Sequence, residues 1–199
     1  MGKNLKVHIS GILIMIFAVS AGILSPLQLQ AVVLVSLFGF ISLMFILLVL
    51  AAPILFKVKK CRFTSHLMSH MRWIGIYTFI FALIHVLLVL NFFFAWDIVT
   101  AMQDQYRFIG GIAFLILAAM AATSNDAAVR KIGRNWKRLH RLVYIALLLV
   151  IIHSFNIGQI FAKELWIKAA VAIIAVIIVV WKLYKRVKKK TSSPEPAQI

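Results

Sequence analysis

The chain is 199 residues long and strongly basic, with a net charge of +17, yet 63% of its residues are hydrophobic and its mean hydropathy is +1.01. This composition favours one integral membrane domain over a soluble fold. It argues against nucleic-acid binding, which would need a polar, soluble framework for so many Lys and Arg residues. The single cysteine, Cys61, excludes an intrachain disulfide and gives no indication of a thiolate metal cluster.

Six apolar stretches have lengths close to a membrane span. A hydrocarbon core of about 30 Å needs roughly 20 mostly apolar residues per helix, so we expect an all-α integral membrane protein with a six-helix transmembrane bundle. The predicted spans are residues 8–24, 31–56, 73–95, 108–122, 142–155 and 165–181. The fifth is short, and a helix beginning upstream at Asn135 or Trp136 would lengthen it. We assign residues 1–190 to one membrane domain and residues 191–199 to a disordered cytoplasmic tail.

Lys and Arg residues lie almost entirely on one side of the predicted bundle. Of the 22, all but Arg107, Lys163 and Lys168 fall in the N-terminal segment, the second and fourth connections and the C-terminal tail. Cytoplasmic segments retain an excess of these residues, so both termini are predicted to be cytoplasmic. An alternative is that the first span is a signal peptide cleaved near AVSAG. We favour a retained helix, because an even number of spans agrees with a cytoplasmic basic tail.

The interiors of the spans contain no Asp, Glu, Lys or Arg, and their ionisable residues are histidines. His85 and His153 lie deep in the third and fifth spans, and His140 lies at the inner edge of the fifth. Ionisable residues inside a membrane are functional candidates. A proton-coupled transporter usually needs a carboxylate and a voltage sensor needs arginines. Neutral imidazoles on separate helices suit axial ligation of haem iron in a helix bundle.

The two deep histidines lie at matching depth. His85 is 13 residues after Arg72, and His153 is 12 residues after Arg141. At 1.5 Å per residue, both lie about 18–20 Å from these inner cations. We therefore expect them to face each other across one haem. The alternative is that each histidine only hydrogen-bonds a neighbouring helix, as lone histidines in membranes often do.

At the inner boundary, His140 matches His70 and His66 in depth, which suggests a second haem with His70 as the favoured partner. The competing interpretation is that His70 and His66 are solvated residues of an interfacial loop. Their i, i+4 spacing lacks the Glu and the third ligand of a metal site. His140 and His153 would lie about 140° apart on an ideal helix. A distorted turn, a π-bulge or laterally offset haems would be needed to explain this.

Small and aromatic residues have more than one explanation. Gly75, Gly110 and Gly111 lie in the third and fourth spans, where they permit either close helix packing or space for a flat cofactor. The five tryptophans lie near predicted span ends and are explained as an aromatic belt at the membrane interfaces. They are Trp73, Trp96, Trp136, Trp166 and Trp181.

Two segments carry a resemblance to a known family. The first is RWIGIYTFIFALIH, which ends at His85, and the second is ATSNDAAVRKIGRNWKRLHRLVY, which contains His140 and precedes His153. The other positions that carry it are Arg72, Gly75, Thr123, Ser124, Gly133, Trp136, Leu139, Arg141 and Tyr144. From about Arg72 to His153, the chain resembles the ferric reductase-like transmembrane family.

The resemblance implies haem b, one or two per chain, with iron ligands at His85, His153 and His140, and electron transfer from the cytoplasm to the periplasm across the bacterial inner membrane. Within the family, the likeness is to members that serve a periplasmic methionine sulfoxide reductase subunit. Free ferric chelate is the alternative acceptor.

The electron donor is not identified by any sequence motif. The chain has no GxGxxG fingerprint and no P-loop, so we expect any NAD(P)H or FAD domain on another protein. Candidate donors are a quinol, a cytoplasmic flavin reductase or bound FMN. The basic segment RKIGRNWKR offers a positive surface for a flavin or for membrane lipid headgroups. The competing hypothesis is a non-redox transporter or assembly factor, which would lack reducible b-type absorption bands.

Overall fold

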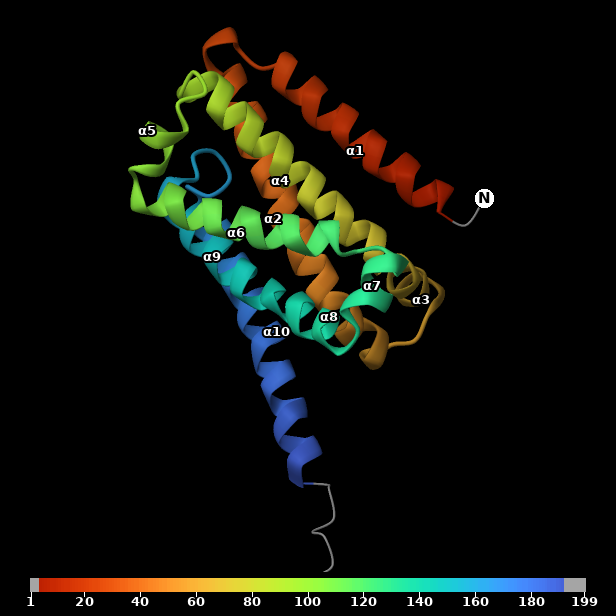
Figure 1. Cartoon of the computed structure of the whole chain (residues 1–199). Coiled ribbons are helices and arrows are strands. Elements are labelled where there is room, and N and C mark those ends of the chain that lie inside the picture. The colour runs from red at the N-terminus through yellow and green to blue at the C-terminus, as the bar shows by residue number, and fades with distance from the viewer. Residues whose placement is uncertain (1–3, 192–199) are drawn as a thin grey trace, which may run out of the picture.

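The computed structural model describes residues 4–191, and all regular structure within that range is helical (Figure 1). Six helical stretches are long and apolar enough to cross a membrane, which confirms the predicted all-α, six-span class. The helices of these stretches are α1 (Leu5–Ile23), α2 (Gln30–Val58), α4 (Met71–Phe93), α6 (Gln105–Ala122), α9 (Val143–Ile157) and α10 (Leu165–Thr191). The 3-10 helix η1 (Leu27–Leu29) precedes α2, while α8 (Arg134–Leu139) and the 3-10 helix η2 (His140–Leu142) precede α9.

Two helical stretches begin or end outside the apolar runs that predicted them. The fifth stretch begins at Arg134, within two residues of the upstream start proposed at Asn135 or Trp136. The last helix continues ten residues beyond the predicted end at 181, to Thr191, because Lys and Arg favour helix where hydropathy no longer does. Residues 192–199, which make up most of the predicted disordered tail, lie outside the described residues.

Three short helices occupy connections for which the sequence predicted no helix. They are α3 (Arg62–Ser69), α5 (Ile98–Met102) and α7 (Asp126–Ile132). Side chains before α5 and α7 accept hydrogen bonds from their first-turn N–H groups: Asp97 from Thr100 at 3.0 Å and Asn125 from Ala128 at 2.8 Å. Such caps satisfy N–H groups that have no partner within the helix, which allows helices this short to persist.

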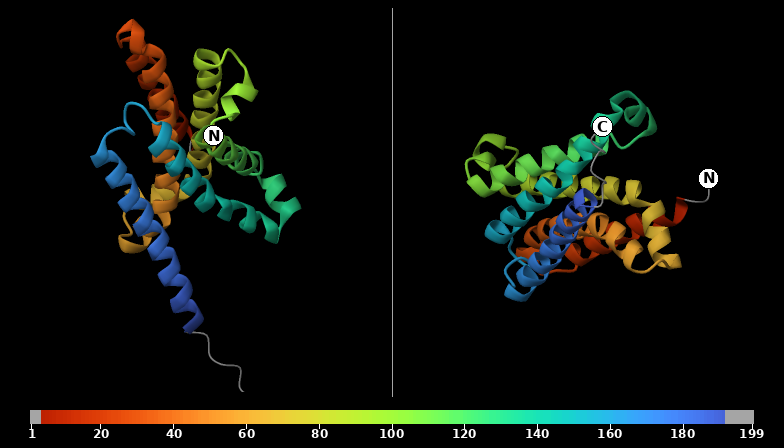
Figure 2. Two further views of the ribbon diagram at one scale, coloured as in Figure 1. Left: turned by 90° about the vertical axis from the view of Figure 1, so that its left-hand side faces the viewer. Right: turned by 90° about the horizontal axis from the view of Figure 1, so that it is seen from below.

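Helix α2 lies at the centre of the bundle. It packs along α4 and also contacts α1, α9 and α10, while α6 packs along α9 and contacts α4 (Figures 1 and 2). One apolar cluster joins Ile46 of α2 to Leu147 of α9 and Ile178 of α10, and a smaller one joins Ala18, Phe38 and Phe81. The α2–α4 and α6–α9 pairs therefore meet both through α4 with α6 and through α2 with α9.

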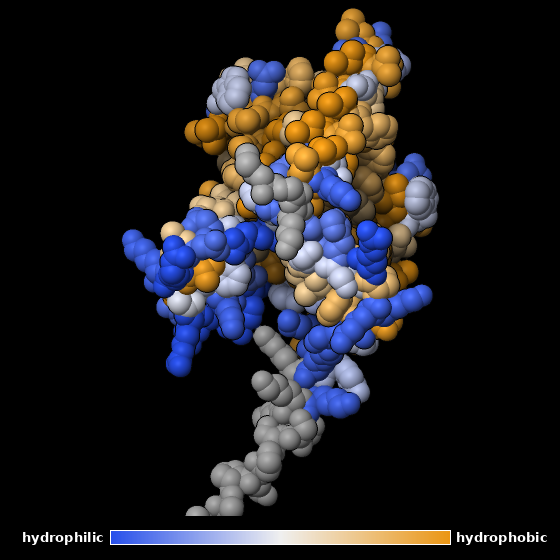
Figure 3. Space-filling model, turned by 90° about the vertical axis from the view of Figure 1, so that its right-hand side faces the viewer, coloured by the Kyte–Doolittle hydropathy of each residue, from blue (hydrophilic) through white to orange (hydrophobic). Residues whose placement is uncertain are grey.

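The surface divides into apolar and basic regions. Large side chains such as Phe17, Leu115 and Ile173 are 67%, 66% and 59% exposed, as expected for helices that contact lipid tails. Figures 1 and 2 show α3, α7 and α8 at one end of the bundle and the α1–α2, α4–α6 and α9–α10 connections at the other. Figure 3 shows hydrophilic residues gathered toward one end and hydrophobic residues toward the other. This segregation agrees with the uneven distribution of Lys and Arg from which the orientation was predicted. The orientation itself stays a prediction.

Candidate functional site

His85 of α4 and His153 of α9 point into the same region between the helices. Their ring centroids are 6.2 Å apart, and the ring planes make an angle of 83°. Counting residues from the inner cations led us to expect this proximity, and the bundle brings the two rings together.

A backbone carbonyl of a neighbouring helix holds each ring. Nδ1 of His85 lies 2.8 Å from the carbonyl oxygen of Val35 in α2, and Nδ1 of His153 lies 2.9 Å from that of Tyr106 in α6. A carbonyl oxygen only accepts, so Nδ1 is assigned as the donor in each neutral ring and Nε2 keeps its lone pair. These are the interhelical hydrogen bonds that the alternative interpretation expects. They use Nδ1 and leave Nε2 of both rings as a lone-pair donor to a metal.

Glycines allow the rings to lie against the neighbouring helices. A Cβ added at Gly39 would lie 2.9 Å from Nδ1 of His85, and one at Gly110 would lie 2.6 Å from Nδ1 of His153. Both distances are shorter than real Cβ contacts, so any larger residue would displace a ring. Gly75, by contrast, has no atom near its added Cβ within 4 Å. Of the glycines that the sequence singled out, Gly110 supports a candidate residue directly.

Each imidazole contacts a glycine and a backbone carbonyl of a neighbouring helix, and we call these two sites the glycine cradles. They share one local pattern. Gly39 follows Val35 by four residues, and Gly110 follows Tyr106 by four. In an α-helix, the carbonyl oxygen of residue i accepts the N–H of residue i+4, on the same face. A glycine at i+4 removes the Cβ that would shield this oxygen, so the imidazole reaches its second lone pair. Sequence reasoning missed Gly39, although the repeated spacing is a signal that could have found it.

The residues at this site fit a haem held by two axial imidazoles. Two imidazoles bound to one iron through Nε2, with metal–nitrogen bonds of about 2 Å, place their ring centroids roughly 6 Å apart. The observed separation is 6.2 Å. Among the described residues, no three His, Cys, Asp or Glu side chains gather to hold a metal ion. The donor set therefore suits a cofactor that carries its own equatorial ligands.

His140 occupies a different environment, at the predicted inner end of the span that contains His153. It begins η2, the tightened 3-10 turn between α8 and α9. This distorted turn is one of the three explanations offered for why His140 and His153 need not follow one ideal helix. The ring stacks on Trp136 with a centroid distance of 4.0 Å, and Nε2 lies 3.4 Å from Oγ1 of Thr123.

The turn before α8 fixes this inner cluster. Gly133 has φ 57° and ψ −126°, a combination that residues with a Cβ rarely adopt. The turn sends the chain back so that the Trp136 indole N–H donates to the Thr123 carbonyl oxygen at 2.9 Å. Trp136 therefore has a definite structural contact in addition to its expected place in the aromatic belt.

The interpretation of His70 as a solvated loop residue is wrong. His70 is 6% exposed at the junction of α3 and α4, whereas His66 is exposed. The segment folds as the end of an amphipathic helix, which turns Leu67 and His70 inward. Nδ1 of His70 lies 2.8 Å from the carbonyl oxygen of His66 and 3.1 Å from Oγ of Ser69. His140 contacts Trp136 and Thr123 instead, so its pairing with His70 stays a prediction.

Residues 21–151 match the model of the family described as ferric reductase like transmembrane component. The chain belongs to this family. The matched region contains His85 and His140 and ends two residues before His153. The match covers three of the six spans completely and most of the fifth, together with most of the segment from Arg72 to His153 that carries the sequence resemblance.

Several named proteins are similar in sequence to this chain. Magnetosome protein MamZ of Magnetospirillum gryphiswaldense is 33% identical over 129 residues, which cover 62% of this chain and 19% of MamZ. The protein-methionine-sulfoxide reductase heme-binding subunit MsrQ of Xanthomonas campestris is 30% identical over 135 residues, which cover 63% of this chain and 61% of that protein. MsrQ of Ralstonia nicotianae is 33% identical over 121 residues, 57% of this chain and 56% of that protein. No solved structure matches the chain.

Proposed function

We propose that the chain is a haem b-binding membrane subunit that passes electrons from a cytoplasmic or quinol donor to a periplasmic acceptor. The observation that carries the proposal is the facing pair His85 and His153, each with Nδ1 on a backbone carbonyl and Nε2 left to bind iron. A haem bound there supplies a centre that gains and loses single electrons. If both imidazoles bound the iron, they would leave it no open position for a substrate, which favours electron transfer over chemistry at the iron.

The surrounding residues set the properties of the two ligands. The Val35 and Tyr106 carbonyls fix the orientation of both imidazoles and increase the basicity of Nε2. Both oxygens belong to membrane-spanning helices, so they are held by the backbone rather than by mobile side chains. A ligand pair fixed in this way changes little between oxidation states, which suits repeated electron transfer.

We place a second cofactor position at His140, where the imidazole stacks on Trp136 near the basic α7–α8 segment. The group there is either a second haem, with His70 as the predicted partner, or FMN, whose phosphate the basic segment would attract. The number of haems is therefore one or two, and their ratio to protein distinguishes these possibilities.

The proposed acceptor is a periplasmic methionine sulfoxide reductase, because two of the similar proteins are named as heme-binding subunits of that system. Free ferric chelate is the alternative, favoured by the family description. At the predicted outer end, Asp97 and Asp104 cap α5 and α6, while Arg107 donates to the Ala101 carbonyl at 3.0 Å. The charges at this end nearly balance, because Glu164, Lys163 and Lys168 join these three, so electrostatic steering of an acceptor should be weak.

Two donors fit the predicted inner end. A cavity of about 190 Å³ between α1, α2, α3 and α4 includes Lys6, Ser10, His66 and Tyr77 in its lining. Polar groups within mostly apolar walls suit the head of a quinol. The basic α7–α8 segment instead suits a cytoplasmic flavin reductase. Replacing Tyr77 by Phe should slow reduction by a quinol and leave reduction by NADH with a flavin reductase unchanged.

The proposed function is tested by following the oxidation of the reduced protein. Protein reconstituted in vesicles and reduced chemically should be reoxidised by the periplasmic reductase together with a methionine sulfoxide substrate. Oxidation by ferric chelate alone would contradict the reductase partner and retain the haem conduit. Failure of both acceptors would contradict the direction of transfer or the acceptor class. A transporter or assembly factor, the remaining alternative, would show no reducible haem bands after haem-replete expression.

A further inference from the structure

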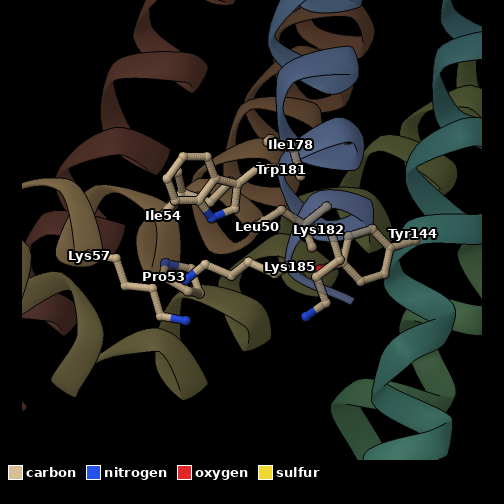
Figure 4. Close-up of a pocket in the computed structure, with 9 residues that line it drawn as sticks. All are labelled: Leu50, Pro53, Ile54, Lys57, Tyr144, Ile178, Trp181, Lys182 and Lys185. Carbon is tan, nitrogen blue, oxygen red and sulfur yellow. The ribbon is translucent and has the colours of Figure 1, made fainter. Parts of the chain in front are cut away.

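A small basic cleft lies between α2, α9 and α10, and no histidine lines it. It has a volume of about 70 Å³, and its lining includes Lys57, Lys182, Lys185, Trp181 and Tyr144 (Figure 4). Figure 4 shows the three lysines gathered from α2 and α10 around one opening, with the two aromatic rings beside them. The proposed electron transfer uses none of these residues.

The lysines approach one another without a neutralising carboxylate. Lys57 and Lys185 line the same small cleft, where two protonated ammonium groups repel each other. The Lys182 ammonium lies 5.6 Å from the Tyr144 ring centroid, and that of Lys185 lies 5.3 Å from the Trp181 centroid. Between described side chains, the one salt bridge joins Arg72 to Asp126, far along the chain from this cleft. A bridging anion would relieve the repulsion.

The position of the cleft along α10 identifies the kind of anion. Lys182 and Lys185 follow Leu165 by 17 and 20 residues, so they lie about 26–30 Å along the helix, at the far boundary of a hydrocarbon core of about 30 Å. Lys57 lies in the last turn of α2. In the predicted orientation, the cleft is therefore at the level of the headgroups of the cytoplasmic leaflet.

The cleft also borders surface that faces lipid tails. Val180, Leu183 and Tyr184 of α10 are 57%, 53% and 60% exposed, and Leu55 of α2 is 42% exposed. The volume of about 70 Å³ is far below the roughly 300–1,000 Å³ of cavities that enclose whole small molecules. It suits one phosphate-sized group whose remaining atoms lie outside the cleft.

We infer that this cleft binds the phosphate of an anionic phospholipid, with Lys57, Lys182 and Lys185 as the binding cations and the acyl chains along the exposed apolar faces of α2 and α10. Basic pockets between transmembrane helices on the cytoplasmic side are suited to such headgroups. The lipid bridges α2 to α10 and so stabilises the packing of the last helix on the bundle.

The test measures lipid binding by the whole protein with two lysines replaced. Lys57→Gln/Lys185→Gln removes two cations of the cleft, and Lys131→Gln/Lys137→Gln removes the same charge from exposed positions of α7 and α8. Native mass spectrometry counts bound phosphatidylglycerol in mixed nanodiscs with phosphatidylcholine. The cleft variant should bind phosphatidylglycerol roughly thirtyfold more weakly, and the α7–α8 variant should lose only the much smaller contribution of general surface attraction.

Three further results decide the inference. Lys57→Arg/Lys185→Arg keeps both charges and should restore binding, which separates loss of charge from loss of fold. Equal weakening in the cleft and α7–α8 variants would overturn the inference in favour of nonspecific surface attraction. The last measurement compares thermal stabilisation by inorganic phosphate, in phosphatidylcholine nanodiscs, with that by phosphatidylglycerol. If the two are equal and the cleft variant loses the effect of phosphate, the inference is overturned and the cleft is assigned to free phosphate.

Discussion

The predicted outer and inner histidines of this bundle contrast in how their rings are held. His85 and His153 are each hydrogen-bonded through Nδ1 to a carbonyl of another helix, and they approach each other to 6.2 Å between ring centroids. His140 instead stacks on Trp136 four residues earlier in its own segment, and His70 is hydrogen-bonded to His66 of α3. The outer pair is oriented by tertiary packing, whereas the inner residues are oriented by local structure.

This difference in how the rings are held indicates at which position the bundle orients the ligands before iron binds. A ring fixed by a backbone carbonyl directs Nε2 without a rearrangement when iron binds. At the inner position, Nε2 of His140 lies 3.4 Å from the hydroxyl of Thr123, so iron would have to replace that contact. We therefore expect the outer position to bind haem more tightly than the inner one.

The largest effect is expected from removing an outer ligand. Replacing either His85 or His153 by Ala should abolish the same haem signal, because one remaining axial imidazole holds the iron loosely. The measurement is the haem-to-protein ratio together with the reduced absorption spectrum. His8→Ala is the matched control, since His8 contacts Tyr77 and Trp73 rather than the pair. An unchanged spectrum in both outer variants would show that these residues are not ligands.

Replacing His140 by Ala tests the inner position. We expect a parent ratio near two haems per chain and a variant ratio near one, with the outer haem spectrum retained. If His70 is the second ligand of the inner haem, His70→Ala should also lower the ratio to near one. If His70→Ala keeps a ratio near two, that second ligand is a non-histidine group. A ratio near one in the parent itself would return His140 to a structural or flavin-contacting role.

The glycine cradles should tune the outer haem without removing a ligand. Gly110→Ala and Gly39→Ala place a Cβ 2.6 Å and 2.9 Å from an imidazole nitrogen, so both should weaken haem retention, Gly110→Ala more strongly. Haem loss to excess apomyoglobin measures the effect. Gly75→Ala meets no atom within 4 Å and should be neutral or stabilising by up to about 1 kcal/mol, since Ala favours helix. Equal retention in all three variants would contradict the proposed role of the cradles.

The smallest effect concerns the inner end. Arg72 hydrogen-bonds Asp126 at 2.8 Å between α4 and α7, and this bond lowers the pKa of the Asp126 carboxyl below its usual value. A lowered pKa stabilises the fold above the unfolded pKa of about 4, and the contribution is lost as the pH falls through the folded value. The side chains are 47% and 71% exposed, so the effect should be small and reduced by salt.

Thermal unfolding of the Asp126→Asn variant checks this contribution. At about pH 7 its midpoint temperature should lie slightly below that of the parent, and the difference should vanish below the folded pKa. A double-mutant cycle with Arg72→Gln separates the ion pair from the favourable position of Asp126 in the first turn of α7. A difference that persists unchanged at low pH would show that the ion pair does not cause it.

The sequence by itself determined the class of the fold and the choice of candidate residues. Six long apolar runs predicted six spans, because hydropathy is a local property that a bilayer imposes on every crossing helix. The distribution of Lys and Arg separated two ends, and the absence of other ionisable residues from the span interiors left His85 and His153 as candidates. Counting residues placed both at one depth, because the rise of a helix is constant.

Tertiary structure alone decided how the imidazoles of His85 and His153 are held. The carbonyls of Val35 and Tyr106, the space at Gly39, the burial of His70 and the Arg72–Asp126 pair all depend on segments far apart in the chain. Hydropathy indicates which residues enter the membrane. Because it is high at nearly every position of an apolar helix, it does not show which face of that helix contacts a neighbour. Which face meets which neighbour is set by packing between helices, and that packing brings the rings of His85 and His153 to 6.2 Å between their centroids.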